Sequence, residues 1–178
     1  MPYLNFNIDP KHSQIHFELD HLAGLSLLTS RISGLQGPLL WDEESGSLSF
    51  DASADTRTVS SALPTLDALL PSHDMFDTKS HPTIRLNVRP FSCNKEQSTA
   101  QGTLTIRGLA VDTEVSIISV RTVVHPRGYN VVGVRASLSV LRSGFGMAVQ
   151  KNPTLKDETR FVFNIEATNE AVSVSRSG

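Results

Sequence analysis

Two histidines and an aspartate are the residues of this sequence best suited to proton-transfer chemistry. His73 and Asp74 are adjacent, just after Pro71, and His21 ends an early run of alternating polar and apolar residues. A histidine that is hydrogen-bonded to a carboxylate can act as a general acid or base near neutral pH. If the fold joins His21 to His73 and Asp74, the chain is an enzyme that uses these side chains for acid–base catalysis. The alternative, which we favour, is that these residues form a polar rim and cap turns.

Sequence motifs for other kinds of catalysis do not occur. There is no Gly-x-Ser-x-Gly motif, no glycine-rich phosphate or dinucleotide loop, and no CxxC or HExxH metal motif. His12 and His16 are four residues apart, but in a strand such a pair lies about 13 Å apart, too far to share a metal ion. The sequence therefore predicts no metal site and no cofactor.

Single arginines are scattered through the sequence, and one of them is a candidate for ligand binding. Arg142 precedes the glycine-flanked segment Ser143-Gly144-Phe145-Gly146-Met147. A guanidinium at the mouth of a pocket can hold an anionic or polar head group. The other arginines are expected on the solvated face of the fold.

Composition excludes several classes of partner. The chain has 178 residues and a formal net charge of −2, so bulk electrostatics attract neither nucleic acid nor an anionic membrane. No run of apolar residues is long enough to span a bilayer. The segment 1–6 has no features of a signal peptide, which predicts a cytoplasmic protein, or a periplasmic one if an export signal has been removed. The one cysteine, Cys93, excludes an intrachain disulfide.

Most of the sequence alternates between apolar and polar residues, which is typical of half-buried antiparallel strands. Turn signals separate about eight or nine such runs, and no βαβ pattern is present. Within 113–124 the parity of the apolar positions changes, which indicates a β-bulge or burial on both faces. Because the strands are long and their edges must be hidden, we predict an all-β, closed antiparallel β-barrel of about eight strands. The prediction places a single domain over residues 1–178.

One short helix is predicted at 62–70. Leu63, Leu66, Leu69 and Leu70 share a face, and Pro71 ends the helix. We expect it to cover one end of the barrel, either as core packing or as a lid over a ligand.

Five segments together resemble the YceI-like family, whose members are lipocalin-like barrels that bind polyisoprenoids and related amphiphiles. The segments occur in the family's order across residues 6–168. They are Ile8-Asp9-Pro10-Lys11-His12-Ser13, Asp20-His21-Leu22, the central stretch from Asp67 to Ile84, Gly102-Thr103-Leu104-Thr105-Ile106-Arg107-Gly108, and Leu141-Arg142-Ser143-Gly144-Phe145-Gly146-Met147.

The chain departs from the family pattern at four polar positions, now Asp20, Leu66, Leu69 and Gly144. The two leucines make the helical segment more apolar, which favours a long apolar ligand or a packed, ligand-free end. The resemblance implies a barrel with a long internal tunnel, one isoprenoid or acyl chain inside it, and a homodimer.

Residues of the inward parity, together with the central stretch, are the predicted lining of that tunnel. The predicted ligand-binding residues are Phe17, Leu19, His21, Leu66, Leu70, Met75, Phe76, Leu86, Leu104, Val134, Leu138, Arg142, Phe145, Phe161 and Phe163. We therefore expect a protein that binds a polyisoprenoid, an isoprenoid quinone or a fatty-acyl compound for carriage, storage or sequestration. Apart from such a ligand that co-purifies, we expect no cofactor. The alternatives are a packed barrel that serves as an interaction or stress scaffold without a ligand, and an enzyme that acts on a small amphiphile at the barrel mouth with His21 or His73 and Asp74.

Overall fold

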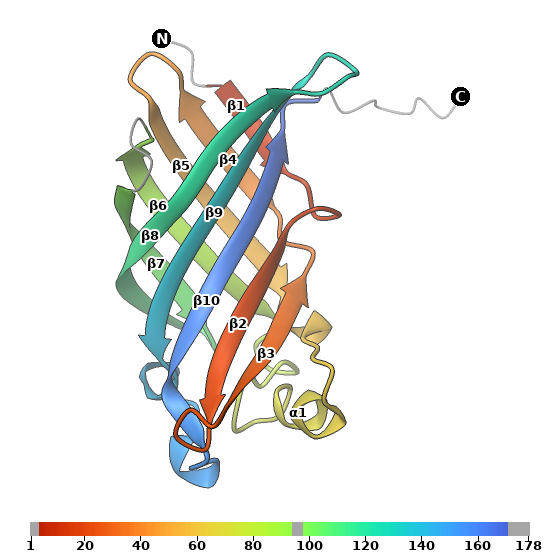
Figure 1. Cartoon of the computed structure of the whole chain (residues 1–178), viewed down its shortest axis with the longest axis vertical. Coiled ribbons are helices and arrows are strands. Elements are labelled where there is room, and N and C mark those ends of the chain that lie inside the picture. The colour runs from red at the N-terminus through yellow and green to blue at the C-terminus, as the bar shows by residue number, and fades with distance from the viewer. Residues whose placement is uncertain (1–3, 94–97, 171–178) are drawn as a thin grey trace, which may run out of the picture.

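The computed structural model describes residues 4–93 and 98–170 (Figure 1). In this part the chain forms ten strands, one short α-helix and three 3₁₀ helices. The strands are β1 (Leu4–Ile8), β2 (Gln14–His21), β3 (Ser26–Ser33), β4 (Gly37–Asp42), β5 (Ser47–Asp55), β6 (Thr83–Ser92), β7 (Ser98–Ile106), β8 (Leu109–Val124), β9 (Asn130–Leu141) and β10 (Leu155–Thr168). The helices are η1 (Thr56–Thr58), α1 (Pro64–Leu69), η2 (Arg142–Phe145) and η3 (Val149–Lys151).

All ten strands belong to one antiparallel sheet, in the order β1-β4-β5-β6-β7-β8-β9-β10-β2-β3. β1 also pairs with the end of β10, at Asn7–Thr168 and Ile8–Ala167, and this closes eight strands into a ring. The rest of β10 pairs with β2, which in turn pairs with β3. The predicted all-β closed barrel is confirmed. The sheet holds ten strands rather than the eight or nine expected, because β1 and β2 pair with different parts of the same edge of β10.

The wall between β3 and β5 is held by isolated contacts instead of a continuous ladder. Two isolated bridges cross this line, Arg31–Ser60 and Gln36–Ser53. The backbone N–H of Ser33 also donates to Thr58 Oγ1 at 2.9 Å. Segments outside the sheet therefore complete the wall here, and α1 lies at the same end as the β2–β3 turn (Figure 1).

Alternation along the strands sends one set of side chains into a continuous apolar cluster. In β5 every second residue is buried, and in β10 the buried positions include Phe161, Phe163 and Ile165. The parity change predicted within 113–124 is a register shift of β8 against β9, between Ile117 and Ser119. Burial of the inward-facing apolar side chains is the main source of stability, at roughly 25 cal/mol per Å² of apolar surface removed from water.

The helix is shorter than the predicted 62–70. α1 is Pro64–Leu69, and Leu66 is its buried residue. Leu63 has extended backbone angles, φ −114° and ψ 113°, at the position before the helix, and its side chain is 45% exposed. The prediction that Leu63 lies on the buried face is therefore wrong. The helix starts two residues later than predicted, so Leu63 lies outside it and does not share its buried face.

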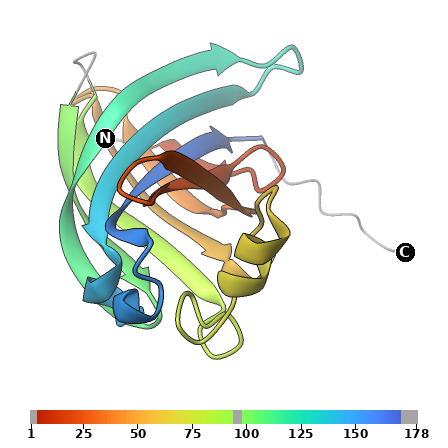
Figure 2. The ribbon, with the colours of Figure 1, turned by 60° about the horizontal axis from the view of Figure 1, so that its bottom comes forward.

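Residues 70–82, which we call the plug, close the same end of the barrel (Figure 2). The plug has no regular secondary structure and is held by its own turns. The backbone N–H groups of Met75 and Asp77 donate to the carbonyl of Ser72, and that of Phe76 donates to the carbonyl of Leu70. Met75 and Phe76 are buried, so the plug places two large apolar side chains inside the ring.

Within residues 4–93 and 98–170, no helix combines the length and apolar character needed to cross a membrane. The described residues form one barrel. The prediction of a single domain over 1–178 includes residues 1–3, 94–97 and 171–178, which lie outside the described residues.

Gly37 should be hard to replace. Its φ is +134°, and an added Cβ would lie 1.9 Å from the carbonyl oxygen of Asp51 on β5. We expect Gly37→Ala to lower the free energy of unfolding by about 3 kcal/mol, from strain and overlap together. Gly144→Ala, where no atom lies within 4 Å of the new Cβ, should change it by less than about 0.5 kcal/mol. Urea denaturation measures both. Equal effects would show that the close approach of β4 to β5 is not needed.

Candidate functional site

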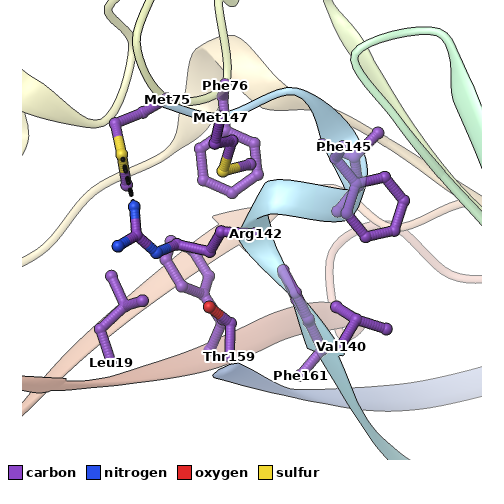
Figure 3. Close-up of a pocket in the computed structure, with 11 residues that line it drawn as sticks. Leu19, Met75, Phe76, Val140, Arg142, Phe145, Met147, Thr159 and Phe161 are labelled. Carbon is purple, nitrogen blue, oxygen red and sulfur yellow. Dashed lines mark hydrogen bonds between the residues drawn. The ribbon is translucent and has the colours of Figure 1, made fainter. Parts of the chain in front are cut away.

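An apolar pocket lies inside the plug end of the barrel (Figure 3). Strands β2, β7, β9 and β10 of the sheet contribute to it, and the plug and the segment 142–149 close it. Its lining residues are Phe17, Leu19, Met75, Phe76, Ile106, Val140, Arg142, Phe145, Met147, Thr159 and Phe161. The cavity volume is ≈ 10 Å³, about the room that one water molecule needs.

The structure brings seven of the predicted ligand-binding residues into this pocket. These are Phe17, Leu19, Met75, Phe76, Arg142, Phe145 and Phe161. Seven others are buried elsewhere in the apolar cluster: Leu66, Leu70, Leu86, Leu104, Val134, Leu138 and Phe163. The remaining residue, His21, is half-buried at the end of β2, where its Nδ1 lies 3.4 Å from Ser26 Oγ. That all fifteen contact a ligand stays a prediction.

Aromatic rings fill the barrel around the pocket. The ring of Phe17 lies 5.4 Å from that of Phe76 and 5.5 Å from that of Phe161, centroid to centroid. These tilted arrangements are typical of stable aromatic pairs. An open tunnel, as the resemblance implied, is therefore not seen among these residues. A chain can enter here only when side chains move.

Arg142 is a buried charge in an apolar surrounding. Its side chain is 2% exposed, and Arg142 is the one charged side chain among the buried polar residues of the described part. Nε donates to the carbonyl of Lys156 at 3.0 Å, and Nη2 to the carbonyl of Leu155 at 2.9 Å. β10 shifts register against β2 between Leu155 and Thr159, and this irregularity accompanies the two carbonyls that Arg142 binds.

Burial lowers the pKa of Arg142, and the more distant carboxylate of Asp157 acts in the opposite direction. An arginine side chain remains protonated in proteins despite such shifts, so the pocket holds a positive charge. Asp157 itself accepts hydrogen bonds from the N–H and hydroxyl of Ser143, at 2.8 and 2.7 Å. The first turn of η2 is thereby fixed to the irregular start of β10.

Arg107 fastens the plug, a role that the sequence analysis missed when it placed this side chain on the solvated face. Arg107 is half-buried, and its Nη1 donates to the carbonyls of His73 at 2.6 Å and Met75 at 2.9 Å. It lies with Gly108 in the two-residue β7–β8 turn, where both residues have positive φ. The backbone N–H of Ala148 donates to the carbonyl of Asp74 and ties the plug to the segment 142–149.

The acid–base site of His21, His73 and Asp74 is not assembled. His73 Nδ1 lies 3.2 Å from Asp77 Oδ2, and the His73 side chain is 83% exposed. Asp74 pairs with Lys151 at 3.3 Å. Burial raises the pKa of Asp77, but the hydrogen bonds with His73 and Ser80 and the charges of His73 and Arg107 together outweigh it and leave that pKa below its usual value. The hypothesis that these three residues act together is therefore wrong, because each has a separate partner at the rim.

Asp9, His12 and Glu166 form the described group whose side-chain atoms come within metal-ligand reach, within 4.8 Å of one another. His12 Nδ1 lies 2.6 Å from Asp9 Oδ2, and this contact raises the pKa of His12. The pair is thus a satisfied contact in the turn between β1 and β2. His16 lies on β2 and does not join it.

Four lining residues were not predicted: Ile106, Val140, Met147 and Thr159. Strand parity could have identified three of them. Ile106 has the parity of Leu104, Val140 that of Leu138, and Thr159 that of Phe161. Thr159 was overlooked because it is polar.

Removing the Arg107 side chain should loosen the plug. We expect Arg107→Ala to lower the free energy of unfolding by about 1–2 kcal/mol, because two carbonyls lose a charged donor at a partly exposed position. Amide hydrogen exchange of Met75, Phe76 and Asp77 should be faster than in the wild type. Arg121→Ala, at an exposed position on β8, is the matched control. Unchanged exchange in the plug of Arg107→Ala would contradict the proposed clamp.

Solved structures with the same fold come from several bacteria. The Campylobacter jejuni YceI protein superposes with a TM-score of 0.73 at 20% sequence identity, covering 83% of this chain and 88% of its own. Burkholderia cenocepacia BcnA gives 0.73 at 15% identity, covering 89% and 98%. A domain from Saccharophagus degradans, described as a polyisoprenoid binding domain implicated in plant cell wall breakdown, gives 0.64 at 14% identity, covering 91% and 97%.

At these identities the structures establish the fold alone. No curated protein matches the sequence. The model of the YceI-like domain matches residues 6–167, nearly the whole of the barrel. The chain therefore belongs to the YceI-like family.

Proposed function

We propose that this protein binds one long-chain amphiphile inside the barrel and carries, stores or sequesters it. The ligand class is a polyisoprenoid, an isoprenoid quinone or a fatty-acyl compound. The observation that carries this proposal is an almost wholly apolar pocket closed by two segments outside the sheet, the plug and residues 142–149. These segments can move without breaking any strand pair. Membership of the family, and the description of the Saccharophagus degradans domain as polyisoprenoid binding, support the same class of ligand.

The driving force would be burial of the hydrocarbon chain. Each CH₂ removed from water contributes about 0.8 kcal/mol, so ten carbons contribute about 8 kcal/mol before ordering costs. Because the cavity measures only ≈ 10 Å³, the chain must displace Met75 and Phe76. Exposing each of these side chains costs about 1.5–3 kcal/mol. Short chains therefore bind weakly or not at all, and longer chains overcome the cost of displacement.

The small cavity also favours a second candidate function. A barrel whose interior is already filled can act as an interaction or stress scaffold that takes no ligand. The contacts of the Phe17 ring with the rings of Phe76 and Phe161 support this second candidate, because these side chains already fill the interior. The two functions differ in one measurable respect, the uptake of a chain by purified protein.

Two further expectations from the sequence belong to this proposal. The protein forms a homodimer, and it works in the cytoplasm. Size-exclusion chromatography with light scattering tests the first, and fractionation of the source cells tests the second.

Binding should strengthen with chain length. We expect native mass spectrometry to detect one ligand per chain when the protein is incubated with fatty acids of ten, fourteen and eighteen carbons or with prenols of increasing length. Affinity should rise by up to about fourfold per added CH₂ until the interior is filled. Failure to take up any of these compounds would contradict the proposal and support the packed scaffold.

Two variants separate interior binding from adsorption on the surface. Phe76→Leu shortens a plug side chain that is 2% exposed, so the interior gains room and ligands should raise its melting temperature more than that of the wild type. Leu25→Ser removes an apolar side chain that is 80% exposed on the β2–β3 turn. It should bind as the wild type does. If only Leu25→Ser changed binding, the chain would lie outside the barrel.

A further inference from the structure

Exposed leucines gather at the plug end of the barrel. Nine large apolar side chains are exposed in the described part of the chain, and six of them are leucines of this end, 45–80% exposed. They come from the β2–β3 hairpin, the residue before α1, the start of β8 and the end of β9: Leu22, Leu25, Leu27, Leu63, Leu109 and Leu141. The other three are Leu40 on β4, and Val123 and Val124 beside the β8–β9 turn. Single exposed apolar residues are normal, but six at one end indicate an interaction surface.

Contacts place these leucines beside the segments that close the pocket. The backbone N–H of Leu22 donates to the carbonyl of Thr154 at 2.8 Å, just before β10. A Cβ added at Gly146 would lie 3.7 Å from Leu109 Cδ1, so the start of β8 reaches the segment that follows η2. Leu141 directly precedes η2, and α1 leads into the plug. Figure 2 turns this end toward the viewer and shows the β2–β3 turn, α1 and the plug there. The exposed leucines therefore border the plug.

The charged side chains of the same end include acids and bases that pair with one another. Lys156 Nζ lies 3.7 Å from Asp20 Oδ2, at the end of β2. On the plug, Asp74 pairs with Lys151 at 3.3 Å. The whole chain has a formal net charge of −2. Such a surface does not attract an anionic partner through a cluster of basic residues, so apolar burial must drive docking at this end.

The arrangement suits a lipid surface better than the face of another protein. The core of a protein–protein interface is depleted of charged residues. Here the leucines stand on four separate segments, and ion pairs lie at the same end. At a bilayer, apolar side chains enter the boundary between head groups and acyl chains, and polar groups stay among the head groups. A zwitterionic head-group layer offers partners to both signs of charge.

We propose that the plug end docks on a zwitterionic lipid bilayer through these leucines, and that the amphiphile passes between the bilayer and the barrel at the plug. The inference rests on the proposed function and names the partner from which the ligand comes. Docking also makes the plug easier to open. Met75 and Phe76 leave the interior for lipid instead of water, so their displacement no longer exposes apolar surface to water.

The first test measures partition of the full-length protein onto vesicles by flotation. The vesicles are phosphatidylcholine alone or phosphatidylcholine mixed with phosphatidylglycerol, each at low and at high salt. We expect the wild type to bind pure phosphatidylcholine. Neither the anionic lipid nor the salt concentration should change the partition coefficient by more than about twofold, because apolar burial is not screened by ions.

Two double variants test whether the leucines carry the docking. Leu25→Ser combined with Leu63→Ser should lower the partition coefficient on the order of 10- to 100-fold. Serine is a favourable N-cap, so the change at Leu63, the N-cap of α1, should not weaken the helix. The matched control combines Val123→Ser with Val124→Ser, at side chains 62% and 69% exposed near the end of β8 that lies away from the plug. It should partition as the wild type does.

Transfer of a ligand supplies a second readout. A fluorescent fatty acid preloaded in phosphatidylcholine vesicles should reach the wild type faster than it reaches the variant changed at Leu25 and Leu63. Equilibrium binding of the same fatty acid without vesicles should be equal for the two proteins, because both substituted side chains lie outside the pocket. A slower transfer with unchanged binding is the result that a docking surface predicts.

The outcomes separate this inference from the proposed function. If the wild type does not float with phosphatidylcholine but takes up a chain in solution, docking is overturned and chain binding stands. If it floats only with phosphatidylglycerol and is released by salt, charge drives the contact and the role of the leucines is overturned. If the leucine variant instead loses self-association in light scattering and partitions as the wild type does, the surface belongs to a second copy of this chain. If the protein floats but binds no chain, the proposed function fails and the docking surface remains.

Discussion

An eight-stranded ring has room inside for its own side chains or for one thin chain, and not for both at once. This constraint governs the structure described here. The inward parity of the strands supplies an apolar cluster, and at the plug end the rings of Phe17, Phe76 and Phe161 already occupy the interior. Any ligand therefore competes with the protein's own side chains. The competition is uneven around the barrel. The strands are fixed by continuous ladders, whereas the plug is held by its own turns and by single contacts from Arg107, Ala148, Lys151 and Thr56.

The charge of Arg142 makes the plug end of the barrel chemically different from the rest of the apolar interior. Burying a cation is costly unless hydrogen bonds compensate it. Two carbonyls from the irregular start of β10 compensate part of the cost, and Met75 completes the set with a weak acceptor. If stability alone set the choice of residue, an apolar side chain of similar length would fill this position at less cost.

The barrel could be predicted from the sequence because the alternation of apolar and polar residues shows directly which side of a strand is buried. It also located the β8 bulge between Ile117 and Ser119, since a register shift must change parity. It could not foresee that β1 and β2 share β10, because pairing partners depend on the whole topology. Leu63 was assigned to the wrong face because the helix starts at Pro64. Thr159 was missed because a polar residue in an amphipathic strand is by default assigned to the solvent. Arg107 lies in a turn, and its contacts with the plug depend on the tertiary fold.

The central claim is that the chain of an amphiphile replaces plug side chains inside the ring. A crystal structure of the protein with a bound long-chain ligand tests this most directly. The account predicts one chain along the barrel interior, with Met75 and Phe76 moved out of the pocket and the strand ladders unchanged. A chain lying on the outer surface, with the Phe17–Phe76 contact still intact, would contradict it.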